Sequence, residues 1–65
     1  MQDVIQQAIA NQQYTNVLKG GVWHCELWVK IAGTRFNSLY RATGATQFEA
    51  LKNAEQLARG VVAPC

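Results

Sequence analysis

The adjacent residues His24 and Cys25 are the side-chain types that could perform nucleophilic catalysis, an imidazole base and a thiol. They lie in the run from Val22 to Lys30, whose β-branched and aromatic residues indicate a strand. Neighbouring side chains on a strand point to opposite faces of the sheet, so this base and this thiol cannot pair with each other. We therefore expect Cys25 to be a small buried core residue and His24 to be a surface residue at a strand end.

The other polar residues do not form a catalytic or metal-binding pattern. The four acidic residues are scattered, and the two cysteines and one histidine lack the spacing of a zinc site. Gly20-Gly21 lacks the following helix that a phosphate-binding loop requires. We therefore expect a protein that is not an enzyme and that binds no metal and no cofactor. We expect Cys65 to be free, with an intermolecular disulfide in oxidised preparations as the alternative.

The stretch from Val22 to Gly44 is predicted to form a long β-hairpin that organises the rest of the chain. Gly33-Thr34 lies between two apolar-rich runs and suits a two-residue type II′ turn. The resulting register pairs Ala32 with Arg35, Ile31 with Phe36, Lys30 with Asn37, Val29 with Ser38, Trp28 with Leu39, Leu27 with Tyr40, Glu26 with Arg41 and Cys25 with Ala42. Because side chains alternate between faces, one face collects the core residues Cys25, Leu27, Val29, Ile31, Phe36, Tyr40 and Ala42.

The opposite face of the hairpin is the predicted binding surface. Its candidate contact residues are Trp28, Lys30, Arg35, Asn37, Leu39 and Arg41. An aromatic anchor beside arginine is typical of a protein-binding hot spot, and it also suits a stacking platform for nucleic acid. The alternative is that a second copy of the chain covers Trp28 in a dimer. An ordinary surface ion pair explains Glu26 opposite Arg41.

One helix and one strand are expected before the hairpin. Asp3 is the predicted N-cap of a short amphipathic helix. The next element is a strand from Tyr14 to Lys19, joined to the hairpin by a type I′ turn at Gly20-Gly21. This turn places Leu18 opposite Trp23 and Asn16 opposite Cys25, and it adds three residues to the predicted core face: Tyr14, Leu18 and Trp23.

A second helix is expected after the hairpin. Thr46 and Glu49 form a capping box at its start, and Gly60 is predicted to end it at the C′ position. Its apolar stripe follows the helical period and should cover the core face of the sheet: Ala50, Leu51, Ala54, Leu57, Ala58 and Val61. The predicted fold is therefore α+β, a two-layer α-β-β-β-α arrangement in which both helices pack on one face of a three-stranded antiparallel meander.

Size and composition indicate one globular domain covering residues 1–65. No run approaches the ~20 apolar residues of a membrane span, and the start has no signal-peptide pattern, so we expect a soluble, cytoplasmic protein that does not contact membranes. The net charge is +2, and the basic excess falls in residues 19–43. So small a core often needs support from self-association, which predicts a homodimer.

The segment from Val22 to Ala58 resembles the latter part of a double-stranded-RNA-binding domain, with two strands followed by an alanine-rich helix. The α-β-β-β-α order extends this resemblance over nearly the whole chain. It implies phosphate binding by lysines at the start of the second helix. This chain has Gln47 and Phe48 where those lysines belong, and it keeps only Lys52, one position away. The segment from Trp23 to Leu51 is also similar to the amino-terminal DNA-reading domains of phage integrases, which use the exposed sheet face.

Three classes of function are compatible with these patterns. The first is a stoichiometric inhibitor or adaptor that occupies the surface of a host protein or nucleoprotein complex, as the anti-CRISPR proteins of phages do. The second is a nucleic-acid-binding module that uses Trp28, Lys30, Arg35 and Arg41. The third is a structural subunit that only self-associates. The lack of catalytic groups and the single Trp-centred patch favour the first class narrowly, because four basic residues offer few phosphate contacts.

Overall fold

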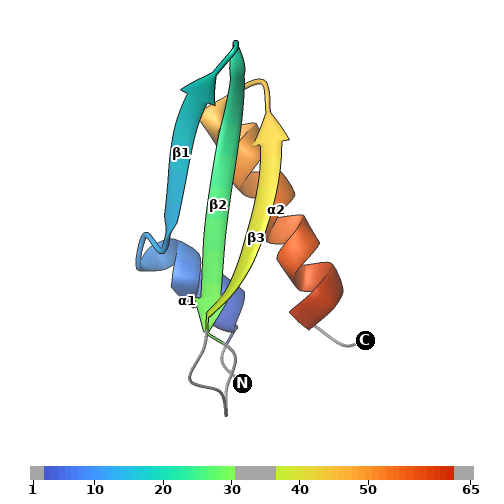
Figure 1. The fold of residues 1–65 in the computed structure, drawn as a ribbon. Coiled ribbons are helices and arrows are strands. Elements are labelled where there is room, and N and C mark those ends of the chain that lie inside the picture. Colours follow the sequence, from blue (N-terminus) through green and yellow to red (C-terminus); the bar gives the residue numbers. More distant parts are fainter. Residues whose placement is uncertain (1–2, 31–36, 63–65) are drawn as a thin grey trace.

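The computed structural model describes residues 3–30 and 37–62. They form an α+β fold in which two helices lie on the same side of a three-stranded sheet (Figure 1). The elements in chain order are α1 (Val4–Ala10), β1 (Tyr14–Lys19), β2 (Val22–Lys30), β3 (Asn37–Gly44) and α2 (Gln47–Val62). The predicted α-β-β-β-α meander is confirmed. Neither described helix is long and apolar enough to cross a membrane.

The predicted register of the long hairpin is confirmed for every pair that the structure describes. β2 and β3 are antiparallel and pair from Lys30 with Asn37 to Trp23 with Gly44. A slip by one residue would turn the apolar residues of either strand toward solvent, which explains why their alternation fixes the register. The predicted turn at Gly33-Thr34 and the pairs closest to it, which include Ile31, Ala32, Arg35 and Phe36, lie outside the described residues.

The junction between β1 and β2 is also the predicted one. Gly20 and Gly21 have φ angles of +61° and +78°, as the two central residues of a type I′ turn require. Glycine adopts these angles without steric cost, so this pair favours the tight reversal. The turn aligns Leu18 with Trp23 and Asn16 with Cys25.

Helix α1 has distinct signals at its two ends. At its start, Oδ1 of Asp3 accepts hydrogen bonds from the backbone N–H groups of Ile5 and Gln6, both at 3.1 Å, which confirms the predicted N-cap. At its end, Gln12 has a φ of +58°, and its N–H donates to the carbonyl of Ile9 at 3.0 Å. Gln13 donates to Ala8 in the same way at 2.9 Å, which completes a Schellman motif and turns the chain into β1.

Helix α2 begins at the predicted capping box but ends later than predicted. Oγ1 of Thr46 accepts from the N–H of Glu49 at 3.1 Å, and Oε2 of Glu49 accepts from the N–H of Ala45 at 3.0 Å. The prediction that Gly60 ends the helix is wrong, because α2 continues through it to Val62. A glycine inside a helix costs only about 1 kcal/mol relative to alanine, so it does not by itself stop a helix.

The core lies between the helices and one face of the sheet. Its buried residues are Ile5, Ala8, Cys25, Leu27, Val29, Tyr40, Ala50, Ala54 and Ala58. The three alanines of α2 allow its backbone to approach the sheet closely. Gly44 completes this contact, since a Cβ at this position would lie 2.5 Å from the amide nitrogen of Ala50. Arg59 of α2 also forms two ion pairs, in which its guanidinium nitrogens lie 2.8 Å from a carboxylate oxygen of Asp3 and 2.8 Å from one of Glu55.

Three residues that were predicted to join the core are exposed instead. Leu18 is 55% exposed, and Leu57 and Val61 are 47% and 68% exposed. Helix α2 runs obliquely behind β2 and β3, and its last turns lie beyond the edge of β3 (Figure 1). The helix therefore does not cover Leu18 on β1, and its own final apolar residues extend past the sheet. Tyr14 and Trp23, by contrast, pack at the margin of the core as predicted.

Candidate binding face

The side of the sheet opposite both helices is uncovered by any described element, and we call it the open face (Figure 1). Alternation along the strands determines which residues lie on it. In β2 these are the even-numbered residues, because Cys25, Leu27 and Val29 are buried on the helix side. The pairing then adds the odd-numbered residues of β1 and β3 to the open face.

Five of the six predicted contact residues lie together on the open face. Trp28 is directly opposite Leu39, and Lys30 is opposite Asn37 in the next row. Arg41 follows Leu39 along β3 and pairs with Glu26. Arg35 lies outside the described residues. The prediction that the hairpin turns Trp28 away from the helices is therefore confirmed by the register.

The row of Trp28 and Leu39 combines an aromatic residue with an exposed aliphatic residue. Trp28 is partly buried, whereas Leu39 is 48% exposed. Nε of Arg41 lies 2.9 Å from Oε2 of Glu26, and the Arg41 side chain is 72% exposed. An exposed ion pair adds less than about 1 kcal/mol to stability, so its main effect is to fix the direction of the guanidinium group.

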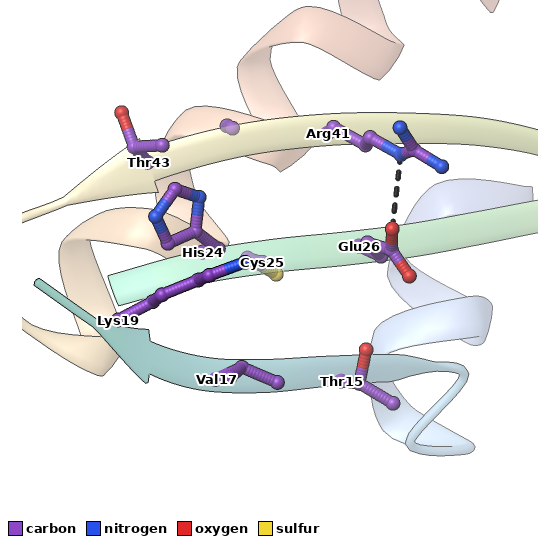
Figure 2. Close-up of a pocket in the computed structure, with 9 residues that line it drawn as sticks. Thr15, Val17, Lys19, His24, Cys25, Glu26, Arg41 and Thr43 are labelled. Carbon is purple, nitrogen blue, oxygen red and sulfur yellow. Dashed lines mark ion pairs between the residues drawn. The ribbon is translucent and has the colours of Figure 1, made fainter. Parts of the chain in front are cut away.

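A hollow of about 540 Å³ extends the open face toward the turn between β1 and β2. Seven of its nine lining residues, from all three strands, have side chains on the open face (Figure 2). The residues are Thr15, Val17, Lys19, His24, Glu26, Arg41 and Thr43, with Cys25 and Ala42 completing the lining. The residues of β1 were not among the predicted contact residues of this surface. The signal was present, because the type I′ turn also places Thr15 opposite Glu26 and Val17 opposite His24.

His24 and Cys25 lie on opposite sides of the sheet and do not form a base–thiol pair. His24 lies on the open face, while Cys25 is 1% exposed on the core side, so the two point in opposite directions as predicted. Burial raises the pKa of the Cys25 thiol, and the nearby Glu26 carboxylate raises it further. A protonated, enclosed thiol is a poor nucleophile. Within the described part of the chain, no three His, Cys, Asp or Glu side chains gather where they could hold a metal ion.

The positive charges of the open face are spread along its length. Lys19 lies beside Val22 at one end of β2, and Lys30 lies at the other end. At the usual rise per residue, these two ends of the strand are about 27 Å apart. The cation between them, Arg41, is already paired with Glu26. Among the described residues, the open face therefore has a lysine at each end and no dense basic cluster between them.

Lys52, the one lysine that remains of the RNA-binding motif, belongs to a different surface. It lies on α2, and its Nζ is 5.6 Å from the centre of the exposed Phe48 ring. Because α2 covers the other side of the sheet, this lysine cannot act together with Trp28 on one flat surface. Comparison with protein-family models, with curated proteins and with solved structures gave no match, so the geometry of the open face is the evidence from which a function can be argued.

Proposed function

We propose that this protein is a non-catalytic binding protein that docks its open face on an acidic surface of a partner protein. The observation that carries this proposal is one row of the open face, where the partly buried Trp28 lies directly opposite the exposed Leu39. Aromatic and arginine residues at the centre of a patch dominate the energy of protein interfaces. Here Trp28 is the aromatic residue, and Arg41, which is paired with Glu26, lies in the next row toward the middle of the sheet.

The charges of the open face indicate the kind of partner. Lys19 and Lys30 lie at its two ends, where they remain partly hydrated on binding and act mainly on the association rate and on orientation. A partner with acidic residues around an apolar depression would match this arrangement. Trp28 and Leu39 would then fill the depression while the lysines contact its rim.

A small protein that covers a partner's surface acts by steric occlusion. The activity we propose is therefore stoichiometric inhibition of a host protein or nucleoprotein complex in the cytoplasm, the mode of action of anti-CRISPR proteins. Support comes from the absence of an assembled catalytic pair at His24 and Cys25 and from the concentration of binding features on one face.

The second candidate function is nucleic-acid binding by the same face. The hollow favours it, because Lys19, His24 and the two threonines could contact phosphates while Trp28 stacks on a base. Two features rank it below protein binding. The carboxylate of Glu26 repels phosphate, and its pairing with Arg41 leaves two separated lysines as the unpaired cations of the described open face.

A pair of matched variants tests the docking face. Leu39 on the open face and Leu57 on α2 are 48% and 47% exposed, so either can be replaced with glutamate without burying the charge, and circular dichroism checks that both variants fold. The immobilised wild-type protein is incubated with an extract of the host cells, and the retained protein is identified. We expect Leu39→Glu to weaken retention of that protein at least tenfold and Leu57→Glu to leave it unchanged. Equal retention by both variants would exclude the open face as the docking site.

A titration with nucleic acid decides between the two functions. The fluorescence anisotropy of labelled duplex and single-stranded oligonucleotides is measured at low and at physiological salt. We expect binding weaker than micromolar at physiological salt, because few phosphates would be neutralised. Tight binding that persists at physiological salt, and that is lost in Lys19→Glu and Lys30→Glu, would reverse our ranking of the two functions.

A further inference from the structure

We infer that two copies of this chain associate through the outer edge of β1, centred on Asn16, and form one continuous antiparallel sheet. This inference goes beyond the proposed docking function and does not depend on it. It concerns the edge of the sheet, whereas docking concerns its open face.

The backbone of β1 has an unpaired edge. The N–H of Trp28 donates to the carbonyl of Gln13 at 3.0 Å, which extends the pairing between β1 and β2 by one residue. Bonding groups alternate in direction along an antiparallel strand, so the odd-numbered residues of β1 bond to β2 and the even-numbered ones point outward. The outward residues are Tyr14, Asn16 and Leu18. No described element lies along this edge (Figure 1).

The other edge of the sheet is partly blocked. Nδ2 of Asn53, on α2, donates to the backbone carbonyl of Thr43 at 2.8 Å. This bond occupies a group of β3 that would otherwise bond to an added strand. β1 lacks the usual protections of an edge strand, because it contains no proline and its single charge, Lys19, is at its end. The geometry therefore favours β1 as the edge that pairs.

Asn16 supplies an independent reason for this pairing. Its side chain is on the helix side of β1, and its Oδ1 is buried without a hydrogen-bond partner among the described residues. Buried polar groups are normally satisfied, and each exception requires an explanation. Across a two-fold axis at Asn16, the two amide groups face each other. After rotation about χ2, each Nδ2 can donate to the Oδ1 of the second copy.

The rest of the strand is complementary to itself about the same residue. An antiparallel pair centred on Asn16 places Tyr14 opposite Leu18 of the second copy and Thr15 opposite its Val17. Leu18 is 55% exposed in the single chain, although it is on the core side of the sheet, and this pairing covers it with an aromatic ring. Lys19 falls opposite Gln13, so no like charges meet. An interface of this kind is isologous, as closed dimers require.

Analytical ultracentrifugation of the purified protein tests this inference. We expect a monomer–dimer equilibrium in which Asn16→Lys weakens the dimer at least tenfold, because lysine on an edge strand opposes pairing. Leu39→Lys, a change at an exposed position on the open face, should leave the dimer unchanged. Circular dichroism of both variants is the control for folding. A monomer at all concentrations, or a dimer that is lost in Leu39→Lys and kept in Asn16→Lys, would overturn the inference.

Disulfide trapping tests the register of the paired strands. In a Cys65→Ser background, Asn16→Cys places two thiols on opposed residues, whose Cα atoms are about 5.5 Å apart in a bonded antiparallel pair. A disulfide spans that distance. Leu18→Cys is the control, because its two copies would be about 14 Å apart. With oxidised glutathione, we expect Asn16→Cys to form the covalent dimer at least tenfold faster than Leu18→Cys, and equal rates would contradict the proposed register.

Discussion

Replacing Gly44 with alanine should destabilise the protein by about 1–3 kcal/mol, because the added methyl group has no space between β3 and the start of α2. Gly44 does not have a positive φ, because Gly20 and Gly21 are the only described glycines that do, so its backbone conformation is open to other residues. The expected effect is therefore one of packing. It tests whether the close contact between helix and sheet holds the fold together.

The structure gives the size of the effect. A Cβ on Gly44 would lie 2.5 Å from the nitrogen of Ala50, whereas ordinary contacts begin near 3.4 Å, so the first turn of α2 must move away by about 0.9 Å. A gap of that width removes a quarter to a half of the dispersion energy at each affected contact. The fully buried Ala50 and Ala54 would lose contacts with the sheet. A domain of this size has only about 3–5 kcal/mol of stability in total, so the loss is a large fraction.

Urea unfolding, followed by circular dichroism, measures this loss, and thermal unfolding provides a second measurement. Each kcal/mol lost lowers Tm by about 4–8 °C for a domain of this size. Gly60→Ala is the matched control, because Gly60 lies inside α2 and nothing is within 4 Å of an added Cβ. That change should instead raise stability by about 0.5–1 kcal/mol, through the better helix propensity of alanine. A Gly44→Ala variant as stable as the wild type, or two substitutions with the same sign, would refute the packing argument.

Three further predictions concern the two ends of helix α1 and the buried thiol of Cys25. Hydrogen bonds from the Gln6 N–H and from the Arg59 side chain lower the pKa of Asp3 in the folded protein. The Asp3 carboxylate therefore stabilises the fold at pH values above the unfolded pKa of 3.8, and this stabilisation is lost as the pH falls through the lower folded pKa. Asp3→Asn, which keeps an N-cap oxygen, should flatten the acid side of the curve of unfolding free energy against pH, and a slope equal to that of the wild type would contradict this reading. Gln12→Gly should raise the free energy of unfolding by up to about 1 kcal/mol, because Gln12 has a φ of +58° that glycine adopts without strain. Urea unfolding measures this change, and a lower midpoint would show that the Gln12 side chain compensates for the strain. In a Cys65→Ser background, Cys25 should react with a thiol reagent only at the rate of unfolding, and rapid labelling under native conditions would show that the thiol is not enclosed.

The predictions that rest on signals between residues close together in the chain are confirmed. The turn at Gly20-Gly21, the N-cap at Asp3 and the capping box at Thr46 each depend on residues within about one turn of chain, and all three are confirmed. The register of β2 and β3 was predictable because a single alignment buries the apolar residues of both strands. The placement of Trp28 and Leu39 on the open face follows directly from that alignment.

The errors concern the position of one element against another. Periodicity showed that Leu57 and Val61 belong to the apolar stripe of α2, but not that the last turns of the helix extend beyond the sheet. It placed Leu18 on the core side of β1 without showing that the helix does not cover it. The extent of burial depends on where a helix axis crosses a sheet, and no local pattern determines that crossing.

The sequence alone determined the order of the elements, the pairing of the strands and the face to which each strand residue points, because these depend on local backbone preferences and on alternation. The tertiary structure decided which polar groups meet. It joined Asp3 to Arg59, which are 56 residues apart, and it brought β1 alongside β2 and β3 to form the hollow. It also left Oδ1 of Asn16, on the edge strand β1, without a hydrogen-bond partner among the described residues. Such contacts form only after the helices pack on the sheet, since they join side chains that no pattern along the chain relates to each other.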